Sequence, residues 1–460
     1  MSKIINNKPL LIILAAGFIF KLLYLFVIGP GVFEHWTLAT QDSHSYSGTF
    51  INLVNKGTYT HDQRFVDASY GRLPVVVFAW GIFYLLLGEA KAYVGLALFQ
   101  IILDVIATYL VYKIYLKLFS DKSALIVSSV YAFFPLTLYF VVKTDTEYLS
   151  LFLIILVLHK LIYFENNLKN CLTLGFFLIL GFYIREILLI LIPLSLFYLW
   201  RNHKISFSKY LGMFLFMLVL YLPWPIRNYM KSERLILIKP LSAGYADYQR
   251  DMLGYMYWLY SWHNDQPDDY LAYAYKLDRE IIFPDEVFAT ETEKQLAINT
   301  IQLARKCGTS FVEWQRDAGV KEKCNGCYDR LIARSFNILK KSYKANHPFN
   351  YYIKVPLLNL RKAFFKIDLT YKSMAPELPF KIFMGIRCLL IFSGLFACFV
   401  YWKNDFFKFN LIFYCSIYFL VSALLRQVEM RYLFQADVLI MLSAVAFIAE
   451  RFFKKKTEEV

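Results

Sequence analysis

Charged side chains are scarce in the apolar runs of this sequence, and they gather in three places beside those runs. The first is a polar segment that contains Asp42 and extends to Arg72, and the second is residues 143–147, Lys-Thr-Asp-Thr-Glu, between two apolar runs. The third consists of arginines at the ends of later runs: Arg185, Arg227 and Arg431. A carboxylate can take the proton of an attacking hydroxyl, and a guanidinium binds phosphate through parallel hydrogen bonds. Such a combination suits a reaction on a phosphate-bearing lipid.

Each of these residues also has a purely structural interpretation. Charged residues at helix ends mark the membrane interface at little cost, so every one of these arginines could be an anchor. Asp42 could cap the helix that SYSGTFINLVN suggests, because aspartate and serine are frequent N-caps. The ordered combination, more than any single residue, favours chemistry.

The elements that must position these residues are membrane helices. The chain has 460 residues, of which 58% are hydrophobic, with a mean hydropathy of +0.43, which is high for a soluble protein. Apolar runs of about 20 residues, the length that crosses a hydrocarbon core, recur along the chain. The expected spans are residues 9–28, 92–116, 122–142, 147–164, 169–184, 187–200, 208–225, 381–402, 406–425 and 432–452. The apolar segment 73–88 is shorter and is expected to lie at the interface or to re-enter it.

The basic residues of the short loops orient these spans and predict that both termini are cytoplasmic. Two long segments, residues 29–91 and 227–379, are then expected to lie outside the membrane. The second is rich in helix formers and long enough to be a domain. We therefore expect an all-α polytopic protein of the plasma membrane with about ten transmembrane helices. Its parts would be a transmembrane module (1–226, with the outer loop 29–91), an extracytoplasmic, mainly helical domain (227–379) and C-terminal transmembrane helices (380–460).

Net charge and cysteines add two expectations. The net charge of +15 follows from membrane topology and from attraction to anionic lipid headgroups. Nucleic acid is not expected as a partner, because the basic residues lie beside spans on both faces. The outer segment contains three cysteines, Cys307, Cys324 and Cys327, and we expect two of them to form one disulfide, without a prediction of which two. The alternative is a zinc site formed by the three cysteines and His347.

Six patterns in order resemble the GT-C glycosyltransferases, the superfamily of the protein O-mannosyltransferases and the lipid A aminoarabinose transferases. The patterns are QDSHSYSGTFINLVNKGTY, YGRLPVVVFAWGIFYLLLG, YAFFPLTLYFVVKTDTEYLSLFLIILVL, LGFYIREILLILIPLSL, LPWPIRNYMKSERLILI and VEMRYLFQADVLI. They extend over most of the expected spans.

The resemblance implies an enzyme that moves a sugar from undecaprenyl or dolichyl phosphate to a lipid, glycan or protein hydroxyl at the outer membrane face, with inversion. On this basis Asp42 is the general base. The residues that would hold the acceptor or the sugar are Asp145, Glu147 and Tyr46. The residues that would bind the lipid phosphate are Arg72, Arg185, Arg227 and Arg431. Neither cofactor nor metal is expected, because the activated lipid supplies the leaving group, although the acidic pair could recruit a divalent cation.

Two alternative functions remain open. A flippase or transporter of lipid-linked sugar should carry ionisable residues deep in its spans and matched repeats. Lys21 and Asp104 are the main deep charges, but no matched second half is evident, and we expect Asp104 to pack inward against a neighbour. A ligase or polymerase of lipid-linked glycans would use the same fold with a larger donor.

Overall fold

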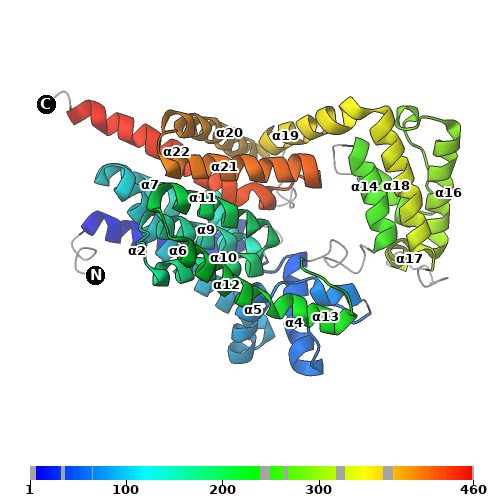
Figure 1. Ribbon diagram of the computed structural model, residues 1–460, viewed down its shortest axis with the longest axis horizontal. Helices are drawn as coiled ribbons and strands as arrows, with labels where there is room; N and C mark the ends of the chain where they lie inside the picture. The colour runs from blue at the N-terminus through cyan, green and yellow to red at the C-terminus, as the bar shows by residue number, and fades with distance from the viewer. Residues whose placement is uncertain are drawn as a thin grey trace.

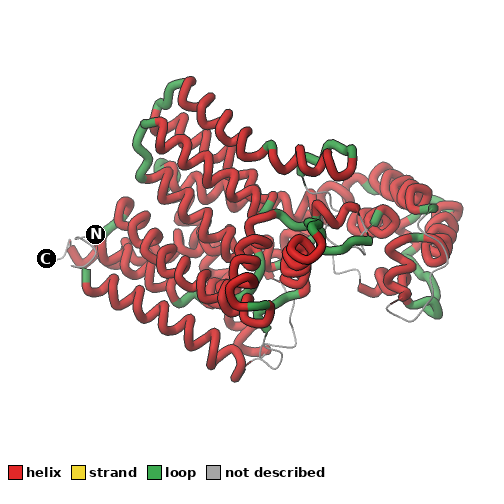
Figure 2. The backbone as a smooth tube through the Cα atoms, turned by 90° about the horizontal axis from the view of Figure 1, so that it is seen from below, coloured by secondary structure: helices red, strands yellow, loops and turns green. Residues whose placement is uncertain are grey.

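The computed structural model describes residues 7–32, 37–64, 66–238, 249–263, 268–316, 327–365 and 377–457. Within these ranges every regular element is a helix, and no strand occurs (Figure 2). The expectation of an all-α protein is therefore confirmed.

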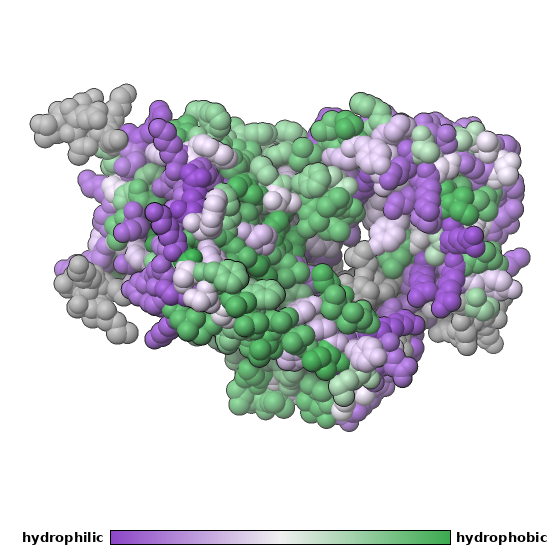
Figure 3. Space-filling view, in the orientation of Figure 1, coloured by the Kyte–Doolittle hydropathy of each residue, from purple (hydrophilic) through white to green (hydrophobic). Residues whose placement is uncertain are grey.

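A bundle of long helices makes up most of the molecule (Figure 1). Its members are α2 (Lys8–Leu23), α6 (Glu89–Leu118), α7 (Asp121–Ala132), α9 (Thr146–Ile162), α10 (Leu168–Ile184), α11 (Leu191–His203), α12 (Phe207–Tyr221), α20 (Glu377–Val400), α21 (Asp405–Phe419) and α22 (Met430–Thr457). Helix α2 begins and α22 ends at the same end of the bundle. Hydrophilic residues gather at that end and over the helical domain at the opposite end, with hydrophobic side chains between them (Figure 3). This banding is what a membrane protein requires.

Six helical stretches of the described chain are long and apolar enough to cross a membrane. They are Lys8–Gly31, Glu89–Leu118, Phe207–Ser232, Lys381–Val400, Asp405–Leu425 and Met430–Phe453. A seventh results if α7 and α8 (Pro135–Val141), which are bent by 49° against each other, count as one span. The other expected spans are helical but shorter, with 17 residues in α9, 17 in α10 and 13 in α11. Ten crossings therefore remain a prediction.

Helix α5 (Pro74–Leu87) corresponds to the apolar segment expected at the interface. It has 14 residues, too few for a perpendicular crossing. Pro74 is its first residue, a position where the missing N–H of proline costs nothing. Gly88 ends it with a φ of +80°, in a region that favours glycine.

A separate helical domain follows the first part of the bundle (Figure 1). It contains α14 (Arg250–Trp262), α15 (Asp268–Tyr275), α16 (Glu291–Cys307), α17 (Thr309–Arg316) and α18 (Asp329–Asn346). Their apolar faces share a core in which Tyr255, Trp258 and Phe336 are fully buried. The π-helix η6 (Asn350–Lys354) and α19 (Val355–Phe365) lead back to the bundle. The domain is thus mainly helical, as expected, whereas its place outside the membrane remains a prediction.

Two ion pairs lie deep inside the bundle. Asp104 of α6 packs against Lys21 of α2 at 2.6 Å, as expected, and the same ammonium donates to the carbonyl of Ala132, where α7 ends. Arg387 of α20 pairs with Asp437 of α22 at 2.6 Å, and both side chains are fully buried. Helix breaks and charged side chains at membrane depth are tolerated only where other groups of the protein pair with the exposed carbonyls and charges.

Candidate active site

The first part of the site is α4 (Gln41–Lys56), the helix that SYSGTFINLVN suggests. Its N-cap is Thr40, whose hydroxyl accepts from the backbone N–H of Ser43, while Ser43 accepts from the backbone N–H of Thr40. This reciprocal capping box satisfies two backbone donors that would otherwise lack partners. Asp42 therefore does not serve as the N-cap, and its carboxylate is directed to other groups.

Both carboxylate oxygens of Asp42 contact arginines from distant parts of the sequence. Arg72, which lies just before α5, donates from Nη2 to Oδ1 at 2.8 Å. Arg431, in the first turn of α22, donates from Nη1 to Oδ2. Arg72 also stands 4.6 Å from the ring centre of Tyr46 and donates to its hydroxyl at 3.4 Å. The predicted base thus lies between two of the predicted phosphate ligands.

The turn before α9 brings two more carboxylates to this place. Asp145 accepts hydrogen bonds from the hydroxyls of Thr40 at 2.8 Å and Ser43 at 3.2 Å, which are the residues that cap α4. Glu147 pairs with Arg185 at 3.2 Å. The same Arg185 nitrogen donates to the backbone carbonyl of Arg431 at 3.2 Å. We call the group of Asp42, Arg72, Asp145, Glu147, Arg185 and Arg431 the charged cluster.

Burial among like charges changes the protonation of this turn. Burial raises the pKa of Asp145 to about 7, and the nearby Glu147 and Asp42 act in the same direction, against the hydrogen bond from Thr40. Burial also raises the pKa of Tyr46 well above its ordinary range, so the phenol keeps its proton. Asp145 can therefore donate or accept a hydrogen bond near neutral pH, whereas the Tyr46 hydroxyl retains a proton to donate.

Arg227 lies apart from the charged cluster, in α13 (Pro223–Ser232). Its guanidinium donates to the carbonyls of Ser69 at 2.7 Å and Tyr59 at 2.9 Å. Tyr59 in turn donates from its hydroxyl to the carbonyl of Arg72 at 2.8 Å. Arg227 thus fastens the loop that carries Arg72, and its predicted contact with a phosphate remains a prediction.

Two residues that contact the charged cluster, Glu429 and Thr40, are not among the site residues predicted from the sequence. Glu429 binds Nε of Arg431 at 2.5 Å, and Thr40 links α4 to Asp145. The sequence holds a signal for Thr40 only in its residue type, because threonine is a preferred N-cap, whereas a typical capping box carries Glu or Gln at the position that Ser43 occupies here. Glu429 stands two residues before Arg431, but this spacing alone does not predict a contact between them.

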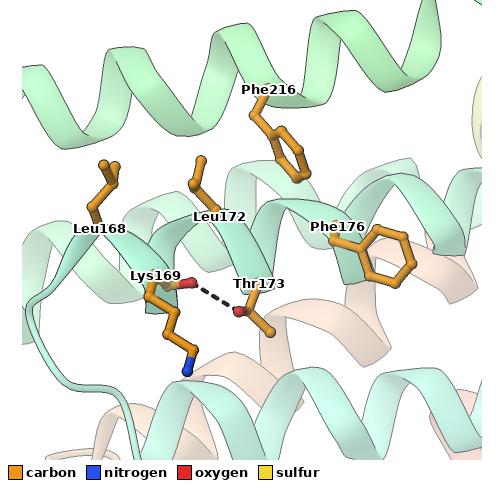
Figure 4. A pocket seen from close by; sticks show the side chains of 6 residues that line it. All are labelled: Leu168, Lys169, Leu172, Thr173, Phe176 and Phe216. Atoms are coloured by element: carbon orange, nitrogen blue, oxygen red, sulfur yellow. Dashed lines mark hydrogen bonds between the residues drawn. The ribbon is translucent and has the colours of Figure 1, made fainter.

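Two hollows on the described part of the surface are lined by residues outside the charged cluster. The hollow between α10 and α12 has a volume of about 490 Å³ and an apolar lining (Figure 4). Figure 4 shows Leu168 and Leu172 turned toward α12, whereas the side chain of Lys169 points the other way. A second hollow of about 370 Å³ is lined by Thr37, Leu38 and Ala39, directly before Thr40, and by apolar residues of the first span and α6.

The structure leaves the metal and disulfide expectations open. Within the described ranges, no three His, Cys, Asp or Glu residues are placed so as to share a metal ion. Cys324 lies outside those ranges. The pairing of Cys307, Cys324 and Cys327 and the zinc alternative therefore remain predictions.

Comparison with known proteins finds a family resemblance over part of the chain. Residues 72–226 match the family model of the dolichyl-phosphate-mannose-protein mannosyltransferases, a GT-C family. This range includes Arg72, Asp145, Glu147 and Arg185, so the resemblance inferred from the sequence is confirmed there. None of the curated proteins matches the chain.

Similar solved structures include oligosaccharyltransferases of Archaeoglobus fulgidus. The apo form is 14% identical with a TM-score of 0.46, and the alignment covers 96% of this chain and 51% of that one. The archaeal oligosaccharyltransferase AglB with an inhibitory peptide and a dolichol-phosphate is 13% identical with a TM-score of 0.46, and covers 99% of this chain and 52% of that one. The chain thus spans about half the length of these structures.

Proposed function

Since residues 72–226 carry the pattern of a GT-C mannosyltransferase family, we propose that this protein is a membrane glycosyltransferase. It moves a sugar from a polyprenyl phosphate to the hydroxyl of a lipid, glycan or protein at the extracytoplasmic face. The observation that carries the proposal is the pairing of Asp42 with Arg72 and Arg431 beside the turn of Asp145 and Glu147. A base and phosphate-binding guanidinium groups are what this reaction requires.

The reaction follows from the charges of the cluster. The acceptor oxygen attacks the anomeric carbon of the sugar, and its proton passes to the carboxylate of Asp42. The bond between the anomeric carbon and the phosphate oxygen breaks, and its electron pair leaves with the polyprenyl phosphate. Attack opposite to the leaving group inverts the anomeric carbon. Charge grows on the phosphate during this step, and guanidinium groups held in place stabilise it there.

The two arginines of Asp42 have different tasks in this proposal. Arg431 is 30% exposed and Arg72 only 5%, so an incoming phosphate meets Arg431 first. When Arg431 turns to the phosphate, Arg72 remains at the carboxylate and favours its ionised form. Asp145, Glu147 and Tyr46 surround the same place and hold sugar or acceptor hydroxyls. The activated lipid provides the leaving group, and the reaction needs no further cofactor.

The direct test is transfer by the purified protein. Protein reconstituted in vesicles with radiolabelled polyprenyl-phosphate sugars and candidate acceptors should release polyprenyl phosphate and label one acceptor class. Movement of intact labelled donor between leaflets without release would contradict the proposal and favour a flippase. Transfer of a whole lipid-linked glycan, with single sugars left untouched, would favour a ligase.

Arg431 and Arg227 give a paired test of phosphate binding. We expect Arg431→Ala to raise the Kd for polyprenyl phosphate about tenfold or more, because a hydrogen bond to a charged group contributes roughly 1.5–3 kcal/mol. The same rise in Arg227→Ala would support its predicted phosphate contact. Unchanged affinity in Arg227→Ala would show that Arg227 only stabilises the loop through the carbonyls of Tyr59 and Ser69. Unchanged affinity in Arg431→Ala would show that Arg431 does not bind the phosphate.

Asp145 predicts a dependence of stability on pH. Its pKa lies at about 7 in the folded protein and at 3.8 ordinarily, so the folded state binds more protons between these values. The stability of the wild type should therefore fall as the pH rises from about 4 through 7, the sign expected for a raised carboxyl pKa. Asp145→Asn should remove this component, as seen in detergent-solubilised protein by thermal unfolding at several pH values. Equal pH slopes in the two proteins would contradict the shift.

A further inference from the structure

Arg426 stands in the short connection between the π-helix η7 (Leu420–Leu425) and α22, five residues before Arg431. Its φ of +57° places it in the left-handed region, which is uncommon for a residue other than glycine. Such a conformation persists where the surroundings hold it. The contacts of the side chain show what holds it here.

The guanidinium of Arg426 binds backbone carbonyls of three segments. Nη1 donates to Tyr260 and Ser261 at 3.2 Å each, and both carbonyls belong to the last turn of α14. Nη2 donates to the carbonyl of Tyr351 at 2.6 Å, and the guanidinium lies 3.9 Å from the centre of that ring. Nε donates to the carbonyl of Ala423 at 3.2 Å, in the last turn of η7.

Three of these acceptors, the carbonyls of Tyr260, Ser261 and Ala423, lie in last turns of helices and share a physical reason to bind a cation. The last carbonyls of a helix lack partners within the helix and carry the negative end of its dipole. A guanidinium offers donors in a fixed fork, so a single side chain can satisfy several such carbonyls at once. Arg426 thereby joins α14 of the helical domain, and η6 directly after that domain, to the end of η7 in the bundle.

The connection after Arg426 leads straight to the charged cluster. Gln427 donates to Glu429 at 2.6 Å, and Glu429 binds Nε of Arg431 at 2.5 Å. Arg431 binds Asp42 through Nη1. The backbone between Arg426 and Gln427 therefore joins two sets of contacts, one to the carbonyls of the helical domain and one that leads to Asp42.

We propose that Arg426 is a positioning residue for the transfer reaction, which sets the place of Arg431 beside Asp42 by fastening the connection 426–430 to the helical domain. This inference rests on the proposed function, in which Arg431 binds the phosphate of the lipid donor. The helical domain then affects the reaction indirectly. A displacement of α14 or η6 moves the connection 426–430 and, with it, Arg431.

The chain offers a matched control for this role. Arg64 also joins the helical domain to a loop of the site, since it pairs with Glu313 of α17 at 2.5 Å, but its side chain is 55% exposed. Exposed ion pairs contribute little. Arg64→Ala should therefore keep transfer within about twofold of the wild type, whereas Arg426→Ala should lose about tenfold or more.

A double-mutant cycle separates positioning from general damage. If Arg426 acts through Arg431, Arg426→Ala should reduce transfer in the wild type and change it by less than about twofold when Arg431→Ala is already present. Arg426→Lys keeps the charge without the fork and should recover part of the activity. Losses of Arg426→Ala and Arg431→Ala that multiply in the double variant would overturn the inference, as would full activity of Arg426→Ala.

A second measurement does not depend on the reaction. Amide hydrogen exchange in residues 427–432 should become about tenfold faster or more in Arg426→Ala or Arg426→Lys and stay unchanged in Arg64→Ala. Unchanged exchange in both Arg426 variants would overturn the inference even where activity falls. Faster exchange with no effect of Arg431→Ala on transfer would refute the role that the proposed function gives Arg431, and with it the positioning role, while leaving the mechanical link established.

Discussion

Asp42→Asn is expected to lower sugar transfer by about 10²- to 10⁴-fold, the range that a general base contributes. The amide keeps the shape of the side chain but cannot take a proton from the acceptor hydroxyl. Donor binding should survive the change, because Arg431 loses a competing carboxylate and remains available for the phosphate. Single-turnover transfer and a separate measurement of polyprenyl-phosphate binding would report the two effects.

The neighbouring Asp62→Asn is the control for this prediction. Asp62 lies in the same stretch of the chain, residues 37–64, and pairs with Arg64 at 2.7 Å, outside the charged cluster. Its replacement should leave transfer within about twofold of the wild type. Full turnover of Asp42→Asn would remove Asp42 as the base. Loss of donor binding together with transfer would instead show that the carboxylate mainly holds the arginines in place.

Arg387→Met is expected to cause the largest loss of stability. Arg387 donates to Asp437 through Nε at 2.9 Å and Nη2 at 2.6 Å, and to the carbonyls of Ala363 and Phe364 in the last turn of α19 at 3.2 Å. Asp437 also accepts from the hydroxyl of Tyr418 at 2.6 Å. Removal of the arginine leaves a buried carboxylate without its cation, which typically costs about 3–5 kcal/mol.

Two further variants complete this test. Arg201→Ala breaks another arginine–aspartate pair between helices, but Arg201 is 47% exposed, so a loss of about 1 kcal/mol or less is expected. The double variant Arg387→Met/Asp437→Leu removes both charges and should recover much of the stability. Unfolding of the purified proteins in detergent would rank the three. Equal effects of Arg387→Met and Arg201→Ala would show that the buried pair is not a structural necessity.

Much of the fold follows from patterns that the sequence displays directly. Hydropathy identifies the long spans, and the spacing of apolar residues in residues 291–307 and 329–346 predicts the amphipathic helices α16 and α18. The number of crossings is harder to predict, because α9 and α10, with 17 residues each, are at the lower limit for a span, and α11, with 13, is below it. The tilt of these helices and their depth in the membrane depend on packing against neighbouring helices, which local hydropathy does not predict.

All six members of the charged cluster are among the candidate residues that the sequence indicates, but their pairings could not be predicted. Asp42 and Arg431 are 389 positions apart, and no local pattern indicates that they meet. Arg227 looked like the other arginines, but it binds backbone carbonyls of a loop. Arg426 was equally hidden, because a carbonyl is present at every residue and leaves no mark in the sequence. Contacts with the backbone must therefore be read from the structure.

The occupation of both Asp42 oxygens has a consequence for the order of events. A carboxylate neutralised on either side is a poor proton acceptor, so a stray water molecule gains little help from it while the donor is absent. When the lipid phosphate arrives, it competes with Asp42 for one guanidinium, and one oxygen of the Asp42 carboxylate becomes available to accept a proton. Kinetics should then be ordered, with the lipid entering ahead of the acceptor, and wasteful hydrolysis of the activated sugar should be slow.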